Sequence, residues 1–180
     1  MRTKIIAWLL LVLAIPSVAA YGQVDISKLR VDTTEVGSVR GLFEQSSLIV
    51  HGSLTSADEQ YPTGQSVNNY KVINYVQSVQ VRKYIKGSAT STIRLLTTGT
   101  DRLPPPPDPL NKMYPGPLAE GEYILFLQKL SGTNLYTVIG GWQGVYPLMG
   151  GKTISLQESG FSDLKGLTVE QMEQKVKQVQ

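Results

Sequence analysis

One long strand-like segment, residues 70–86, constrains the fold of this chain more than any other part of its sequence. Large side chains alternate along it, with Tyr75 and Val79 on one face and Val72 and Val76 on the other. The alternation falters between Val76 and Val79, and such a slip in a long strand predicts a β-bulge where a sheet bends sharply. The segment therefore favours a curved, mainly β fold.

Shorter segments on both sides have the composition of strands and turns. Strands and short β pieces are predicted at residues 47–55, 92–98, 122–127, 135–139, 140–146 and 152–156. Residues 131–134 are predicted to turn between two of these strands as a hairpin, and residues 36–44 favour a short helix. Two long loops are expected, a polar one at 56–69 and a proline-rich, polyproline-type one at 99–121.

Residues 168–179 predict a C-terminal helix whose start is visible in the sequence. Thr168 is a good N-cap, and Gln171 lies three residues later, as a capping box requires. Leu167 and Met172 occupy the two positions of a hydrophobic staple. This helix is expected to pack on the sheet with its apolar face.

The first twenty residues predict a cleavable export signal. Arg2 and Lys4 precede an uncharged apolar run, and the small residues ending at Ala20 suit a signal peptidase. A membrane anchor is the alternative, but the run ends at Pro16 and is shorter than the roughly 20 residues that span a bilayer. A secreted or periplasmic protein is therefore expected, with no stable membrane span after cleavage near Ala20.

The chain contains no cysteine, so an exported domain of this sequence must be held together by packing alone. Its length after cleavage suits one domain with its own core. We expect an N-terminal arm at 21–35 followed by a single domain at 36–180. Without cysteine there is also no thiolate nucleophile or metal ligand, and no lipid on an N-terminal cysteine.

Charge and motif content argue against several functions. The 17 basic residues include Arg2 and Lys4, so the mature chain carries only one more basic than acidic residue, which gives no electrostatic argument for nucleic acid binding. His51 is the one histidine. It is the only histidine that could serve as a general base, although a lone histidine in a strand is more often a packed or surface residue. We expect neither a metal nor a cofactor.

Seven residues are candidates for contact with a partner. A proline run fits an aromatic groove, and aromatic side chains next to glycine or proline stack on sugars or peptides. The alternatives are a stiff loop resting on the domain and rings that cover the core. The candidates are Pro104, Pro105, Pro106, Pro107, Tyr114, Trp142 and Tyr146.

Three segments, 47–54, 79–87 and 118–126, resemble in order the strand core of the netrin-like domains, which include the tissue inhibitors of metalloproteinases. The resemblance covers roughly residues 47–146, and similar cysteine-free stretches occur in exported bacterial proteins. It implies a five-stranded OB-like barrel, and the residues themselves add the short N-terminal helix and the capped C-terminal helix. Those inhibitors chelate a protease zinc through an N-terminal cysteine, which this chain lacks, so no inhibitory residue is carried over.

The sequence therefore predicts an exported, non-catalytic binding module for an extracellular protein or a saccharide. Its expected contact surfaces are the loops 56–69 and 99–121, which shape the mouth of such a barrel. A hydrolase that uses His51 and a structural component of the cell envelope remain as alternatives.

Overall fold

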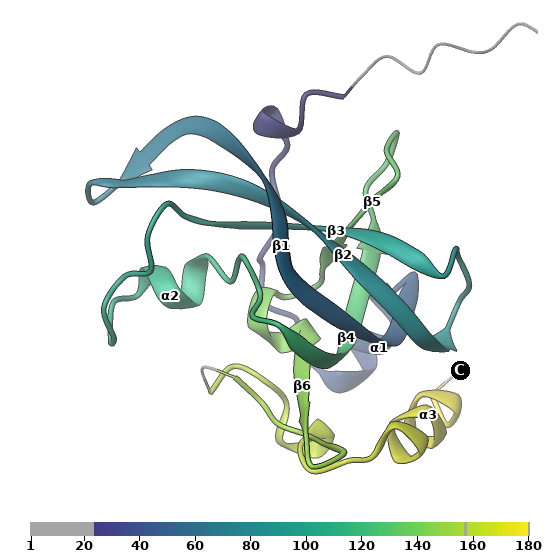
Figure 1. The fold of residues 1–180 in the computed structure, drawn as a ribbon. Helices are drawn as coiled ribbons and strands as arrows, with labels where there is room; N and C mark the ends of the chain where they lie inside the picture. Colours follow the sequence, from purple (N-terminus) through teal and green to yellow (C-terminus); the bar gives the residue numbers. More distant parts are fainter. Residues whose placement is uncertain (1–23, 157, 180) are drawn as a thin grey trace, which may run out of the picture.

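Seven strands form one sheet that closes on itself into a barrel in the computed structural model, which describes residues 24–156 and 158–179 (Figure 1). The predicted export signal lies outside the described residues. The strands are β1 (Leu48–Val67), β2 (Tyr70–Lys86), β3 (Thr92–Thr100), β4 (Gly121–Lys129), β5 (Leu135–Val138), β6 (Val145–Met149) and β7 (Lys152–Thr153).

Five of these strands close the barrel in the order β1-β2-β3-β5-β4, and β4 returns to β1. All of these pairings are antiparallel except β3 with β5, which run parallel. The barrel is filled by side chains from every one of its strands, among them Val50, Val79, Leu95, Leu125 and Val138. The predicted OB-like, five-stranded barrel is confirmed.

The polar segment 56–69, which was predicted to be a long loop, is instead the second half of β1. It pairs with β2 as far as Val67 opposite Tyr70, and Asn68 and Asn69 make the turn with φ values of 49° and 67°. Two consecutive residues with positive φ are the mark of a tight hairpin turn, and asparagine tolerates this conformation better than most residues. The prediction was wrong because the strand is stabilised by its partner rather than by apolar residues of its own.

The predicted bulge near residues 77 and 78 lies on the opposite strand. β2 pairs with β3 without interruption from Val72 to Gln80. On its other side, Leu54 pairs with Val79 but Asp58 pairs with Gln77, so the extra residues belong to β1. The sheet bends at the place that the sequence indicated, through an irregularity in the partner strand.

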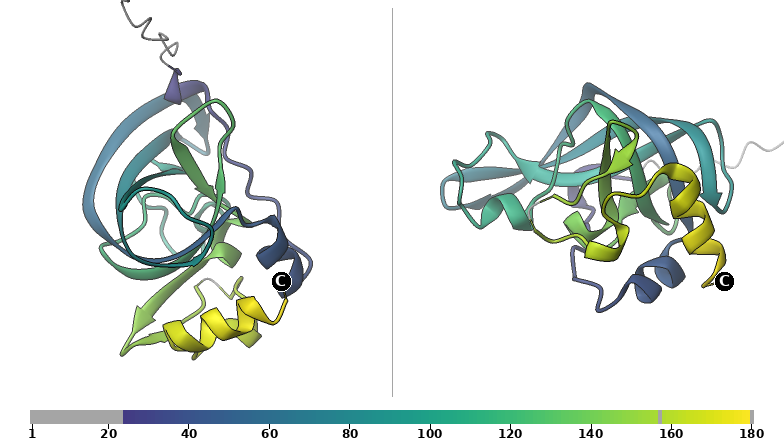
Figure 2. Two further views of the ribbon diagram at one scale, coloured as in Figure 1. Left: turned by 90° about the vertical axis from the view of Figure 1, so that its right-hand side faces the viewer. Right: turned by 90° about the horizontal axis from the view of Figure 1, so that it is seen from below.

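Two helices cover the outside of the barrel near β1, β4 and β6 (Figure 2). They are α1 (Val39–Gln45), capped by Ser38, and α3 (Val169–Lys177), capped by Thr168. Their buried side chains form a second core with the outer face of the barrel, in which Phe126 stacks on Phe43 and meets the edge of Tyr146. Both helices were predicted, and the capping box of α3 is present.

The proline-rich connection from β3 to β4 is less uniform than predicted. It contains a helical turn, α2 (Leu110–Met113), and Gly116 crosses β3 so closely that a Cβ on Gly99 would lie 1.8 Å from the Gly116 carbonyl oxygen. Residues 140–146 also differ from the predicted β pieces, because they include a 3-10 turn, η2 (Gly141–Gly144). Two further 3-10 turns are η1 (Ile26–Lys28) and η3 (Ser162–Leu164).

Candidate binding face

The outer face of β1, β2 and β3 carries the candidate site, because alternate residues of these strands point away from the barrel core. Its centre is apolar and its two ends are polar. The face comprises Tyr61, Thr63 and Gln65 of β1, Val72, Asn74 and Val76 of β2, and Arg94, Leu96 and Thr98 of β3.

The N-terminal arm, residues 24–35, lies across the middle of this face. Ile26, Leu29 and Val31 of the arm pack against a small apolar cluster that includes Val76 and Leu96. Because the arm covers one face and the barrel core covers the other, both faces of β2 are buried over residues 72–77.

Asn74 fastens the arm to the sheet. Its side chain is fully buried, and its amide nitrogen donates hydrogen bonds to the carbonyl oxygens of Ile26 (2.8 Å) and Leu29 (2.9 Å). The Thr98 hydroxyl donates to the Asn74 oxygen at 2.8 Å. The Asn74 NH₂ group thus uses its two donors to hold the backbone of the arm, which belongs to no strand.

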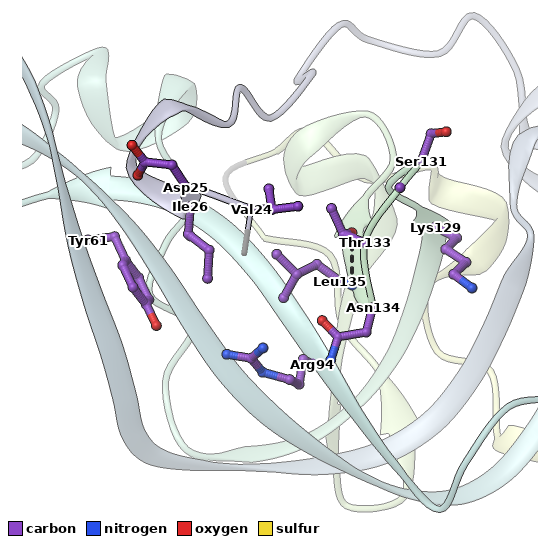
Figure 3. Close-up of a pocket in the computed structure, with 11 residues that line it drawn as sticks. Val24, Asp25, Ile26, Tyr61, Arg94, Lys129, Ser131, Thr133, Asn134 and Leu135 are labelled. Carbon is purple, nitrogen blue, oxygen red and sulfur yellow. Dashed lines mark hydrogen bonds between the residues drawn. The ribbon is translucent and has the colours of Figure 1, made fainter. Parts of the chain in front are cut away.

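A hollow of about 1400 Å³ opens at one end of the arm (Figure 3). Tyr61 and Arg94 lie on one side of it, Lys129 and the turn between β4 and β5 on the other, and Val24 projects between them. The turn is the predicted one at residues 131–134, in which Thr133 accepts a hydrogen bond from the Leu135 N–H at 3.0 Å. We call this space the hollow.

Arg94 and Tyr61 in one wall of the hollow are both bound to Glu59, which lies next to that wall. The Arg94 guanidinium donates to both carboxylate oxygens of Glu59 at 3.0 Å, and the Tyr61 hydroxyl donates to one of them at 2.5 Å. The hydrogen bond from Tyr61, together with Arg94, lowers the pKa of Glu59, and the same hydrogen bond raises the pKa of Tyr61. The Lys129 amine on the other side of the hollow, in contrast, has no ion-pair partner among the described residues.

A second, smaller space of about 420 Å³ lies further along the arm and is called the groove. The arm forms one side with Ser27–Thr33, and the β1–β2 hairpin forms another with Thr63 and Gln65. Met113 and Tyr114 of the proline-rich connection complete the lining. The two segments predicted as contact surfaces, 56–69 and 99–121, therefore meet here. Asp101 links the second segment to β2, since its carboxylate accepts from the Lys71 N–H at 3.0 Å.

The four candidate prolines are not equivalent, and Pro104, Pro106 and Pro107 line a separate space of about 170 Å³ rather than the groove. Pro104 is buried, whereas Pro105, Pro106 and Pro107 are exposed. Leu103 next to them is 86% exposed. The Pro104 carbonyl accepts a hydrogen bond from Asn111 at 3.0 Å, so the run is folded back onto α2.

The three candidate aromatic residues have different surroundings. Tyr114 is half-buried in the lining of the groove. Trp142 is also half-buried, and its indole N–H donates to the Asn111 carbonyl at 2.8 Å, which ties the proline-rich connection to the barrel.

Tyr146 is fully buried, and its hydroxyl accepts from the Phe161 N–H at 2.9 Å. Burial raises its pKa to about 12. Its ring covers the core and cannot stack on a ligand at the surface.

His51 lies in β1 and is half-buried. Its Nε2 is 3.3 Å from a carboxylate oxygen of Glu122, whose other oxygen is 2.7 Å from Arg82. A carboxylate that orients an imidazole is one part of a hydrolytic triad. Here the same carboxylate also forms an ion pair with an arginine, as in an ordinary surface network.

Sequence reasoning predicted an arm at 21–35 but not that it crosses the sheet, and it missed Asn74 and the residues of the hollow. Period-two alternation was visible in β3, where Arg94, Leu96 and Thr98 share a face, but nothing local shows that residues 24–35 cover that face. Within residues 24–156 and 158–179, no cluster of three or more acidic, histidine or cysteine side chains is arranged to hold a metal ion. No helix in that same part of the chain has the length and hydrophobicity to span a bilayer.

Comparison with known protein families, curated proteins and solved structures gives no match for this chain. The netrin-like resemblance therefore stays a prediction from the three strand motifs.

Proposed function

We propose that this protein is an exported, non-catalytic binding module, and that it binds its partner on the face crossed by the arm. One observation carries the proposal: the β1–β2 hairpin, the β4–β5 turn and the arm surround the hollow above β3. In OB-type barrels, ligands bind on the face of strands 2 and 3, between the loop that joins strands 1 and 2 and the loop that joins strands 4 and 5. The hollow lies beside the β4–β5 turn and is lined by Arg94 of β3 and Tyr61 of β1, which supports binding on this face.

The chemistry of the hollow supports binding rather than reaction. Two of its charged lining residues are paired with residues outside the lining, Arg94 with Glu59 and Asp25 with Lys28. Lys129, Asn134 and the hydroxyls of the β4–β5 turn offer polar contacts, and Val24 and Ile26 offer apolar ones. Such a mixed lining suits an extracellular protein or a saccharide.

The test is affinity capture from the native extracellular or periplasmic fraction. The bait is the mature chain, compared with Lys129→Glu and Asn134→Arg, which change charge and fill space in the hollow. The matched control is Lys165→Glu, an exposed lysine in the turn after η3. We expect one set of molecules to be retained by the wild type and the control and lost from both hollow variants. Retention of the same molecules by all four baits would refute the proposal.

The two alternative functions are separated by further measurements. A hydrolase that depends on His51 loses most of its rate in His51→Ala, whereas the proposed module retains its ligands in that variant. A structural envelope component stays with the cell envelope on fractionation, whereas the proposed module is recovered free or with its ligand.

A further inference from the structure

The arm lies on the middle of the outer face of the sheet as a bound peptide would. The part of the sheet beneath it provides three residues that are at most 3% exposed, Val76, Leu96 and Leu135. The arm packs on them with three side chains that are themselves only partly buried, Ile26, Leu29 and Val31. The sheet therefore contains a closely covered apolar strip, and the arm is its cover.

Few polar contacts tether the arm to the barrel. Among the described residues, the hydrogen bonds that join residues 24–35 to the rest of the chain are the two that the Asn74 amide donates to carbonyl oxygens of the arm. No ion pair of the described chain adds to them. The firm attachment begins at Val36, which is buried and whose N–H donates to Gln143 at 2.6 Å.

The arm also leaves much of the face unfilled. The hollow of about 1400 Å³ opens at its Val24 end, and the groove of about 420 Å³ lies further along it. Val24 projects into the hollow (Figure 3) but is 40% exposed, so it fills little of that space. A segment that followed the path of the arm with larger side chains would bury more apolar surface than the arm does.

From the few tethers and the unfilled spaces together, we infer that a peptide segment of a partner protein displaces the arm and binds in its place. The arm shows what the face accepts. Residues 26–31 place apolar side chains at the first, fourth and sixth positions, and two of their carbonyl oxygens accept from the Asn74 amide. The partner segment has this spacing and, in addition, a large apolar side chain that enters the hollow. This inference rests on the proposed function, because it names the partner of the same face.

The arm of a second copy of this chain does not meet these requirements. It carries the same side chains, so it would leave the same spaces unfilled. The tethered arm also competes at a high local concentration, which is in the millimolar range for a short flexible tether. An occupant from outside must therefore gain contacts that the arm lacks, and the hollow is where the structure offers them.

The probe is a fluorescent peptide with the sequence of residues 24–33, carrying Lys28→Gln and Arg30→Gln so that trypsin does not cut it. A second peptide adds Val24→Trp, which places a large ring in the hollow, and a third adds Leu29→Ser to the first. Binding to the mature full-length protein is followed by anisotropy. Displacement of the arm is followed by the rate at which trypsin cuts the protein after Lys28 and Arg30.

The three peptides are expected to differ in both measurements. The tryptophan peptide should bind the wild-type protein at least about tenfold more tightly than the first peptide, because its ring buries apolar surface in the hollow. At saturation it should raise the cleavage rate of the arm about tenfold, because the displaced arm is open to the protease. The serine peptide should do neither.

Protein variants separate the contributions to binding. Leu29→Ser in the full-length chain weakens the hold of the arm and touches neither of the two large apolar cores, so the first peptide should bind about tenfold more tightly than to the wild type. Adding Asn74→Leu removes the two donors and should lower that affinity about tenfold. Lys129→Glu, in the hollow, should leave the affinity of the first peptide unchanged. The peptide test and the capture test of the proposed function can therefore fail independently.

Three results would overturn the inference. They are no binding of the first peptide to the Leu29→Ser protein, equal binding of the serine peptide, and a cleavage rate that the tryptophan peptide leaves unchanged. A rise in cleavage caused by cellotetraose, and by none of the peptides, would also overturn it and would assign the face to saccharides.

Discussion

Gln77 and Leu118 bind each other twice. The Gln77 side-chain amide donates to the Leu118 carbonyl at 2.8 Å, and the Leu118 N–H donates to the Gln77 oxygen at 2.9 Å. Both residues are buried, and Leu118 also joins the apolar filling of the barrel. The Gln77 side chain thus makes the two hydrogen bonds with the Leu118 backbone that a neighbouring strand would make.

Substitution of Gln77 by leucine tests this pair. Gln77→Leu leaves the buried N–H and C=O of Leu118 without partners, so we expect a loss of roughly 2 to 4 kcal/mol in the free energy of unfolding. The control is Gln80→Leu in the same strand, where the exposed side chain should matter by less than about 0.5 kcal/mol. Urea unfolding measures both, and equal losses would contradict the role given to the pair.

Removal of the Asn74 amide should release the arm while the barrel stays folded. Asn74→Leu deletes both hydrogen bonds to the arm, and losing about 1.5 kcal/mol of local stability increases the open population about tenfold. We expect trypsin to cut after Lys28 and Arg30 at least that much faster, with the Gln80→Leu variant as control. An unchanged cleavage rate would show that the apolar contacts alone hold the arm.

The cap of α3 makes a measurable contribution to stability. Thr168 Oγ1 accepts from the Gln171 N–H at 3.3 Å, and Gln171 Oε1 accepts from the Thr168 N–H at 2.9 Å. Thr168→Ala is therefore expected to cost on the order of 1 kcal/mol, and Thr55→Ala, at an exposed position of β1, is expected to cost less. Denaturant melts in which the two variants lose the same stability would remove the cap from the account.

Glu173 makes stability depend on pH in the acidic range. Hydrogen bonds from Lys177 (2.8 Å) and Lys83 (2.6 Å) lower its pKa to about 2, from an ordinary value of 4.5. Because the pKa is lower in the folded protein, the ionised carboxylate stabilises the fold above about pH 4.5, and this contribution is lost as pH falls toward 2.

The Glu173→Gln variant checks this dependence. At pH 6 we expect it to be less stable than the wild type, and the difference should shrink between pH 4.5 and 2. Unfolding midpoints over this range give the answer. Glu35→Gln, which removes an exposed carboxylate that has no ion pair within the described chain, is the control. A difference that does not change with pH would contradict the lowered pKa.

Features determined by neighbours in the sequence were predicted well. The capping box of Thr168 and Gln171 depends on residues three positions apart. The alternation of large side chains along β2 likewise depends on that strand's own residues. The barrel followed from a resemblance of strand motifs, and the structure confirms it.

Features determined by distant residues were missed. The polar residues after Leu54 become a strand because β2 pairs with them, although the two asparagines at 68 and 69 carried a turn signal. The hollow lies at the β4–β5 turn rather than at the proline-rich connection, because the closure of the barrel brings that turn near the hairpin and the arm. Of the hollow and the groove, the groove contains a residue selected in advance, Tyr114.

The pairing of β1 with β4 has a consequence for how the chain reaches its fold. Leu48 lies opposite Leu127, so this pairing, the seam that closes the barrel, joins positions far apart in sequence. In contrast, β1, β2 and β3 follow one another as local hairpins. Bringing distant segments together is entropically costly and slow, so we expect the seam to form late in refolding. Until β4 arrives, the outer edge of residues 48–54 is open, and in a nascent or refolding chain that edge is the place most exposed to aggregation.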